Sequence, residues 1–195
     1  MIVEIITLSG ASGSGKSSYC RELLASDGRF SLIESHTTRA ARSKDLPGEY
    51  VHVSPDFFRD QADGFLWTLD VHGHTYGTMR QTVLDCLRRP ERIGVMLVVP
   101  GCLPILREFV NAQGTGILHF HCLSPSVEKL RERFGRRIAR GDMTSEEAER
   151  RIIDCATVDD DARRSVIPHL FVPADITIEQ AARRILDITV DLRGR

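Results

Sequence analysis

The residues best suited to chemistry form an eight-residue segment that begins at Gly10 and reads Gly-Ala-Ser-Gly-Ser-Gly-Lys-Ser, a complete G-x-x-x-x-G-K-[ST] pattern. Glycines at this spacing allow backbone angles closed to other residues, so that successive N–H groups can turn inward around phosphate oxygens. Lys16 is expected to reach the β- and γ-phosphates of a nucleoside triphosphate, and Ser17 is expected to ligate Mg²⁺. The residues expected to hold the triphosphate are Gly10, Ala11, Ser12, Gly13, Ser14, Gly15, Lys16, Ser17 and Ser18.

The sequence on both sides of this segment favours a phosphate-binding loop. The apolar run Ile2–Leu8 before it is typical of a buried strand, and Ser18–Ala25 after it is compatible with a helix. A glycine-rich turn without a ligand is the alternative. The chain contains only three lysines, so a lysine at this point of the pattern is hard to ascribe to background composition.

A second group of residues is suited to a phosphate monoester. Arg39, Arg42, Tyr50 and Tyr76 fall in one stretch of the chain together with several hydroxyl side chains. Guanidinium groups bind phosphate oxygens in charge-assisted and often bidentate pairs, and tyrosine hydroxyls donate further hydrogen bonds. The alternative is that these arginines are solvated and that the tyrosines belong to the core. Beside an upstream phosphate loop, the pattern indicates an acceptor site.

The composition is that of an ordinary globular protein. The chain has 195 residues, of which 42% are hydrophobic and 27% charged, with a formal net charge of −1. This excludes a disordered or collagen-like chain and does not favour a nucleic-acid binder. No apolar run approaches the roughly 20 residues needed to cross a bilayer, and no signal peptide precedes Ile2, so we expect a cytoplasmic protein without a membrane partner. The five cysteines show no C-x-x-C pair, which favours reduced thiols.

The apolar runs alternate with segments of helical spacing, which predicts an α/β fold with a doubly wound parallel sheet. The expected strands are Ile2–Leu8, Leu32–Ile33, Ile93–Val99, Ile117–Leu123 and Leu170–Val172. The expected helices are Ser17–Ala25, Met79–Leu87, Leu103–Val110, Ser126–Arg137, Ser145–Ala156 and Ile178–Ile188. Residues 36–78 lack a long helix and show β-type alternation at Tyr50–Val53, which indicates an inserted lobe. Residues 136–144 are polar and suit a mobile flap.

With these motifs in view, the chain resembles the guanylate kinases over nearly its whole length. That family has a T-T-R-x-x-R element, a downstream Tyr before an x-V-S segment and a Y-G-[ST] element, and all three are matched here. The resemblance implies a P-loop NTPase-type sheet as a single domain, with core segments 1–35, 89–125 and 157–195, an acceptor-binding lobe at 36–88 and a lid at 126–156. It implies that the acceptor nucleotide is held by Ser35, Arg39, Arg42, Tyr50, Tyr76 and Thr78. It also implies that catalysis uses Lys16 with the lid arginines Arg136, Arg140 and Arg151.

The chain departs from the family where guanine is read. The family has a Glu that binds the guanine N–H edge, and the position is Trp67 here, so Trp67 is expected to contact the acceptor. The family's D-x-D-x-Q-G element is replaced by Met96-Leu97-Val98-Val99-Pro100-Gly101. This removes the carboxylate that usually orients Mg²⁺, and Asp70 and Glu34 are the candidate substitutes that the sequence offers. The ribose 1,5-bisphosphate phosphokinases, a related family, also lack guanine readers.

The main hypothesis is an ATP- and Mg²⁺-dependent phosphotransferase that acts on a small phosphate-bearing acceptor, a nucleoside monophosphate such as GMP or dGMP or a variant nucleotide. A sugar-phosphate kinase and an inactive binding module are the alternatives. A kinase that acts on nucleic acid is the weakest hypothesis, and the oligomeric state is left as monomer or homodimer. Three further candidates are His36 near the acceptor phosphate and the pairs His72/His74 and His119/His121 as metal ligands, each weighed against a structural role.

Overall fold

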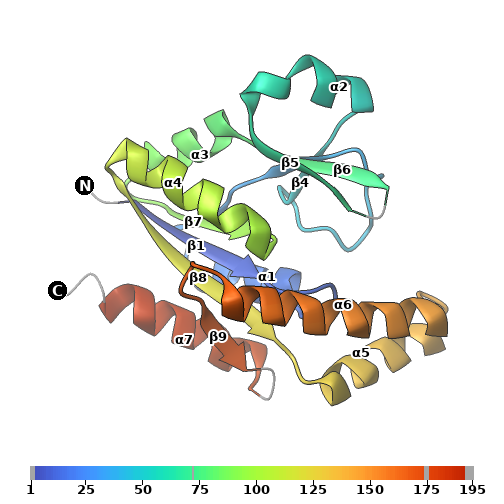
Figure 1. Cartoon of the computed structure of the whole chain (residues 1–195). Helices are drawn as coiled ribbons and strands as arrows, with labels where there is room; N and C mark the ends of the chain where they lie inside the picture. The colour runs from blue at the N-terminus through green and yellow to red at the C-terminus, as the bar shows by residue number, and fades with distance from the viewer. Residues whose placement is uncertain (1–2, 72, 174–175, 192–195) are drawn as a thin grey trace.

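A five-stranded parallel sheet forms the centre of the molecule (Figure 1), with strand order β2-β7-β1-β8-β9. Its strands are β1 (Val3–Ser9), β2 (Phe30–Leu32), β7 (Ile93–Leu97), β8 (Gly116–Ser124) and β9 (Leu170–Pro173). The coordinates are a computed structural model that describes residues 3–71, 73–173 and 176–191. Every predicted strand is present within two residues of its expected ends, and the predicted α/β fold class is confirmed.

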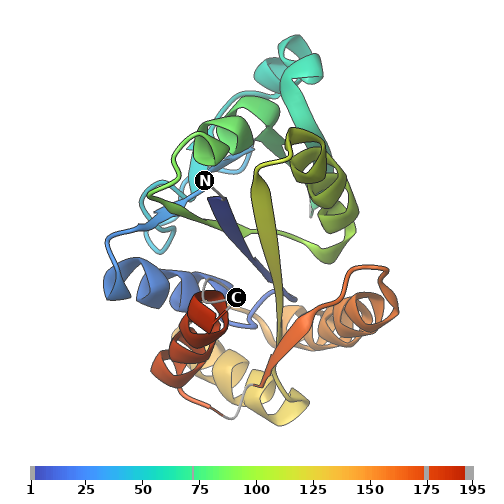
Figure 2. The same ribbon diagram turned by 90° about the vertical axis from the view of Figure 1, so that its left-hand side faces the viewer.

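Helices cover both faces of this sheet (Figure 2). They are α1 (Lys16–Ser26), α3 (Arg80–Leu87), α4 (Leu103–Gln113), α5 (Val127–Ala139), α6 (Ser145–Arg164) and α7 (Ile178–Asp191), with a short 3₁₀ turn η2 (Pro100–Cys102) before α4. Along β1, Ile5 faces the cluster built with α3 and α4, whereas Ile6 faces the cluster built with α1 and α7. A strand buried on both faces has to be apolar almost throughout, which is why it was readable from the sequence.

A second sheet lies above the end of the first and corresponds to the inserted region. Its strands are β3 (Ser35–Thr37), β4 (Tyr50–His52), β5 (Phe65–Val71) and β6 (His74–Met79), in the order β4-β3-β6-β5. Two short helices, α2 (Pro55–Asp60) and η1 (Ala62–Gly64), connect β4 to β5. The side chain of Ser54 caps α2 by accepting from Phe57 N, and Pro55 stands in the first turn, where its missing N–H costs nothing.

Helices α5 and α6 form a third unit with a core of its own. Leu130 and Phe134 of α5 pack with Ile152 and Cys155 of α6, and Ala11 of the phosphate loop belongs to the same cluster. Both helices begin with a hydroxyl cap, because Ser126 accepts from Lys129 N and Thr144 accepts from Glu147 N. Both helices are therefore anchored on the loop by buried apolar contacts.

The sequence placed the end of α6 eight residues too early. The helix continues to Arg164, because Ala162 is buried against the core and Arg164 pairs with Asp160 one turn earlier. The run 136–144 is also less irregular than expected, since α5 extends to Ala139 and only the turn from 140 to 144 lies outside a helix.

All five cysteines are buried and free, as expected for reduced thiols. Within the described ranges, no helix has the length and apolar character needed to span a membrane.

Phe134 tests how strongly α5 is held to the loop. Its ring is 1% exposed, and we expect Phe134→Ala to lower the free energy of unfolding by about 3–5 kcal/mol because a large cavity forms beside the loop. Urea denaturation followed by circular dichroism measures the change. The control is Ile153→Ala on α6, whose side chain is 67% exposed and should alter stability by less than about 0.5 kcal/mol. Equal effects of the two changes would contradict the proposed anchor.

Candidate functional site

A cleft of about 1130 Å³ opens at the carboxyl end of the central strands. The phosphate loop forms its floor, the small sheet forms one wall, and α5 and α6 form the opposite wall. In Figure 1 both walls project from the same end of the central sheet. This is the position where open α/β sheets bind ligands.

The phosphate loop is shaped by glycines at positions that no other residue would fit. Gly10 has φ 126°, and a Cβ there would lie 2.5 Å from the Leu123 carbonyl oxygen. Gly13 has φ 87°, and its Cβ would lie 2.5 Å from the Phe134 ring. Gly15 caps α1, whose first turn carries no acidic side chain, so its free N–H groups and positive dipole end remain available to an anion.

Lys16 is held by the loop itself. Its Nζ donates to the carbonyl oxygens of Gly10 at 2.6 Å and of Ala11 at 2.9 Å. Burial lowers the pKa of this ammonium to about 8, a shift partly opposed by electrostatic interaction with Cys122, Cys155 and, least of the three, Glu49. An arriving phosphate would raise that pKa again, because a negative charge favours the protonated form.

The loop residues proposed for the triphosphate line the cleft, except Ser14, which is buried. Ser17 and Ser18 line the cleft from the first turn of α1, beside Lys16. The sequence pattern and the geometry therefore agree on the donor side.

Three arginines of α5 and α6 face the loop. Arg133 donates to the carbonyl oxygens of Gly13 and Ser14, at 3.1 and 2.9 Å, and Arg151 donates to Ser12 Oγ at 2.6 Å. Arg137 also lines the cleft, and its buried Nε has no hydrogen-bond partner. Burial lowers the pKa of Arg137, the positive charges of Arg151 and Arg42 lower it further, and the nearby acids Glu147 and Asp142 oppose this shift. Arg151 is paired with Glu147, so the cations are partly neutralised, and the Arg137 Nε remains as a buried donor available to an anion.

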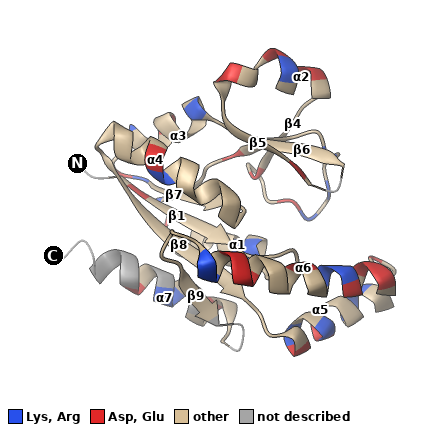
Figure 3. Cartoon of the chain, in the orientation of Figure 1, with Lys and Arg blue, Asp and Glu red and all other residues tan. Residues whose placement is uncertain are grey.

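The arginines expected from the sequence are only partly in this set. Arg151 lies in the cleft, whereas Arg136 is largely exposed and pairs with Glu132, and Arg140 is an exposed C-cap of α5. Figure 3 shows that basic and acidic positions are mixed along the ribbons of α5 and α6. Arg133 and Arg137 were missed, although each lies one turn from a buried apolar residue of α5, Leu130 or Phe134. The catalytic roles of Arg136 and Arg140 remain predictions.

The acceptor side gathers every residue that the sequence proposed for it. The small sheet and its loops bring seven side chains into the cleft: Ser35, Arg39, Arg42, Tyr50, Trp67, Tyr76 and Thr78. Arg39 is 5% exposed and donates from Nη2 to both carboxylate oxygens of Asp45 at 3.0 Å. The same carboxylate accepts from Arg42 N at 2.8 Å, so Asp45 fixes both arginines without being apparent in the sequence pattern.

Aromatic rings and hydroxyls complete this wall. The Arg39 guanidinium lies 5.0 Å from the centre of the Tyr50 ring, which in turn meets Tyr76 edge-on at 5.9 Å. Ser35 Oγ and Thr78 Oγ1 are 3.2 Å apart. Burial raises the pKa of Tyr50, so its hydroxyl stays protonated as a donor.

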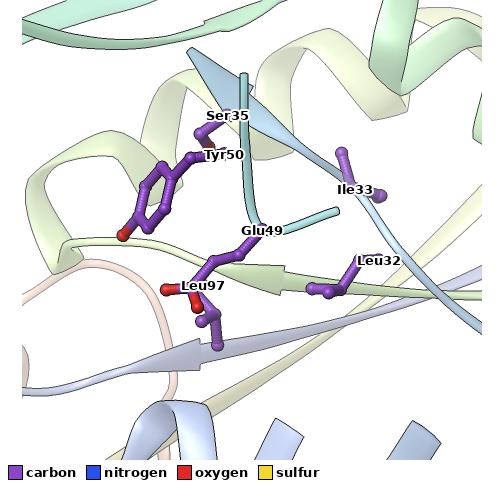
Figure 4. Close-up of a pocket in the computed structure, with 6 residues that line it drawn as sticks. All are labelled: Leu32, Ile33, Ser35, Glu49, Tyr50 and Leu97. Atoms are coloured by element: carbon purple, nitrogen blue, oxygen red, sulfur yellow. The ribbon is translucent and has the colours of Figure 1, made fainter. Parts of the chain in front are cut away.

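Glu49 is a functional candidate that the sequence did not reveal. Its side chain is 7% exposed, accepts from Leu46 N at 3.0 Å and lines the cleft between the small sheet and the phosphate loop. Figure 4 shows it extending toward Leu97 at the end of β7. Its negative charge acts on Lys16, Cys20 and Tyr50, which places a buried carboxylate between the donor and acceptor sides.

Asp70 and Glu34, the substitutes proposed for the missing strand-end acids, are less well placed in the cleft than Glu49. Asp70 is exposed, lines the cleft at its rim and accepts a hydrogen bond from the Thr75 hydroxyl at 2.7 Å. Glu34 is not among the residues that line the cleft. Glu49 and Asp154 of α6 are the other carboxylates that line it besides Asp45.

The histidine candidates have structural surroundings. His36 is buried, stacks on Phe57 with ring centres 5.4 Å apart, meets Phe65 edge-on, and is not among the residues that line the cleft. The suggestion that it touches an acceptor phosphate is therefore wrong. His119 and His121 are buried in β8, where His119 lies 3.2 Å from the Glu4 carboxylate and burial lowers the pKa of His121 to about 4. His72 lies outside the described residues.

Comparison with known proteins gives consistent similarities. The family model described as guanylate kinase matches residues 3–156. A guanylate kinase of Polaromonas sp. (strain JS666 / ATCC BAA-500) is 36% identical over 78% of this chain and 72% of its own length. A guanylate kinase of Nitrosomonas europaea is 31% identical over 94% and 87%. The crystal structure of guanylate kinase from Anaplasma phagocytophilum superposes with a TM-score of 0.66 at 18% identity, covering all of this chain and 87% of that one, which supports the fold.

The lowered pKa of Lys16 predicts a pH-dependent stability. Between about pH 8 and 10.5 the folded protein releases the Lys16 proton while the unfolded chain keeps it, so the free energy of unfolding rises with pH in this window relative to Lys16→Met. Urea denaturation of both proteins from pH 7 to 10.5 measures the difference. Lys129→Met, which removes an exposed lysine paired with Glu132, is the control and should run parallel to the wild type. A constant gap between wild type and Lys16→Met would contradict the shift.

Proposed function

Since this chain belongs to the guanylate kinase family, we propose that it is an ATP-dependent nucleoside monophosphate kinase. In the proposed reaction, an oxygen of the acceptor phosphate attacks the γ-phosphorus of ATP. The bond from the γ-phosphorus to the bridging oxygen breaks, ADP leaves, and the acceptor becomes a diphosphate. The observation that carries this proposal is the convergence of cations from the loop, the small sheet and α5/α6 on one cleft.

The chemistry requires little beyond positioning and positive charge. Phosphoryl transfer distributes negative charge over the moving group, and preorganised cations stabilise that charge where water is excluded. Lys16 and Arg151 lie on the donor side, Arg39 and Arg42 lie on the acceptor side, and Arg137 feels the charge of both Arg42 and Arg151. We infer that Arg137 acts at the junction, where the transferred group would pass.

The donor set also fits a divalent cation. Oxygen ligands suit Mg²⁺, and the hydroxyl of Ser17 and the buried carboxylate of Glu49 line the cleft near Lys16. When bound, the metal would neutralise charge on the donor phosphates. We propose that Ser17 is the direct ligand and that Glu49 replaces the strand-end acids as the carboxylate facing the metal.

Three further parts of the proposal rest on the family resemblance. We propose that residues 36–88 form the acceptor lobe and that residues 126–156 form the lid. We also propose a cytoplasmic protein that acts on small nucleotides, either as a monomer or as a homodimer.

A coupled assay for ADP release tests the activity. The acceptors are GMP, dGMP, AMP, UMP, dTMP, dCMP and ribose 1,5-bisphosphate, each with ATP and Mg²⁺. Turnover of at least one nucleotide supports the kinase. Silence across the panel, with ATP binding to the Mg²⁺-loaded protein intact by calorimetry, would indicate a binding module instead.

Substitution of two neighbouring arginines tests whether Arg137 acts on the transferred phosphoryl group. We expect Arg137→Ala to lower kcat by about 10²- to 10³-fold, because a preorganised cation at the transferred group is lost. Arg136→Ala is the matched control, since its exposed side chain points to solvent and pairs with Glu132. The same assay measures both variants. A larger loss for Arg136→Ala would restore the assignment made from the sequence.

Glu49→Gln tests the metal assignment through binding. Calorimetry gives the ATP affinity with and without Mg²⁺, and we expect the Mg²⁺-dependent gain in affinity to fall about 10-fold in the variant, which is about 1.4 kcal/mol. The affinity without Mg²⁺ should stay equal or increase, because a negative charge near Lys16 is removed. Asp154→Asn is the matched control. An unchanged gain in Glu49→Gln would exclude Glu49 from the metal site.

A further inference from the structure

The cleft wall formed by the small sheet changes from charged to apolar across its strands. One row of side chains runs from Tyr50 on β4 through Ser35 on β3 and Thr78 on β6 to Trp67 on β5. Ser35 is in register with Tyr50, Thr78 is in register with Trp67, and the two central hydroxyls are 3.2 Å apart. The row therefore changes from hydroxyl-bearing side chains on β4, β3 and β6 to the indole of Trp67 on β5.

The next row repeats the same change. Thr37 and Tyr76 are in register on β3 and β6, and Leu69 follows on β5. Arg39, which continues from β3, lies at the charged side of the sheet. A ligand whose phosphate binds Arg39 and Arg42 therefore directs its organic part toward the indole and the leucine.

The apolar end of this wall is fixed in place. Trp67 is 8% exposed and Val98 is 6% exposed, and both belong to one buried cluster that also contains Met96 and Cys102. Both side chains still line the cleft, beside Val99 and Pro100. The indole is thus held in place by its neighbours. A ligand in the cleft can contact only the small part of the ring that is exposed.

This wall offers poor partners for a guanine. The donor edge of guanine carries an N–H and an amino group, and each buried donor without an acceptor costs about 1–3 kcal/mol. An indole contributes only another donor, and a valine contributes neither donor nor acceptor. Asp70 alternates with Trp67 and Leu69 along β5, lies at the rim of the cleft, and already accepts from Thr75. A smaller base with fewer donors and more apolar surface would lose less on entering this site.

Building on the proposed kinase function, we propose that the acceptor is a pyrimidine nucleoside monophosphate, whose base packs against Trp67 and Val98. The hydroxyls of Ser35 and Thr78 supply the polar contacts to its ring, and guanine nucleotides are discriminated against.

Trp67 supplies a direct readout, because it is the only tryptophan of the chain. The wild-type protein is loaded with Mg²⁺ and a non-transferring ATP analogue, then titrated with dTMP, dCMP, UMP, GMP and ribose 5-phosphate while tryptophan emission is recorded. We expect at least one pyrimidine nucleotide to bind about 10-fold more tightly than GMP and to change the emission, and ribose 5-phosphate to leave it unchanged. Tightest binding by GMP would overturn the proposal, as would pyrimidine binding without a change in emission.

Substitution tests the chemistry of the wall. Trp67→Glu and Val98→Asp, separately and together, introduce hydrogen-bond acceptors into this wall, where the N–H groups of a guanine would need them. We expect the ratio of kcat/KM for GMP to that for dTMP to rise at least 10-fold. Trp67→Phe is the matched control, which keeps an apolar ring and should retain the wild-type ratio. An unchanged ratio in folded Glu and Asp variants would overturn the proposal.

The substrate panel with the wild-type protein distinguishes a failure of the kinase function from a failure of the pyrimidine proposal. It does not require that any variant folds. If no monophosphate supports ADP release while ATP and Mg²⁺ still bind, the kinase function itself fails. If GMP or AMP is turned over with the highest kcat/KM, the nucleoside monophosphate kinase stands and only the pyrimidine acceptor is wrong. Turnover of the sugar phosphate alone would overturn both.

Discussion

The structure depends on the contact between the phosphate loop and α5, where the ring of Phe134 occupies the space that a side chain at position 13 would need. This contact satisfies one requirement of the loop and one of α5. The loop must have positive φ angles to turn its N–H groups inward, and α5 must be close enough to present arginines to the same anion. Because Ala11, Leu130 and Phe134 share one buried cluster, movement of α5 is coupled to the shape of the loop. The donor site and the wall above it therefore behave as one packed unit.

The arginines on the two sides of the cleft have different partners. On the acceptor side, Arg39 is neutralised by Asp45, so the guanidinium is held in place before any ligand arrives. On the opposite wall, Arg137 has a buried nitrogen without a partner and lies among mixed charges, where Arg151 and Arg42 disfavour its positive charge and Glu147 and Asp142 favour it. The first arrangement favours precise orientation, whereas the second leaves a guanidinium N–H available to an anion. Under the proposed function, that N–H would be available to a phosphate that moves between the two sides of the cleft.

The sequence predicted the fold well because its central strands are buried on both faces and read as uninterrupted apolar runs. It also identified loop and acceptor candidates that line one cleft, apart from Ser14, and their binding roles remain predictions. It did less well on α5, where adjacent residues point about 100° apart and an error of one position moves a side chain to another face. The buried pair Leu130 and Phe134 decides that rotation, and it brings Arg133 and Arg137 to the cleft. Glu49 and Asp45 could not be predicted, because both lie in an irregular segment whose path is set by contacts with the central sheet and the small sheet.

The hydrogen bonds of Lys16 also affect which anions the loop can bind. Its ammonium donates to two backbone carbonyls of its own loop, so displacing it costs two hydrogen bonds before any new one forms. A small monovalent ion such as chloride offers one charge and no geometry to offset that loss. A polyphosphate engages the lysine, the helix end and the loop N–H groups at once. These hydrogen bonds of Lys16 therefore favour binding of a polyphosphate over binding of a small monovalent anion.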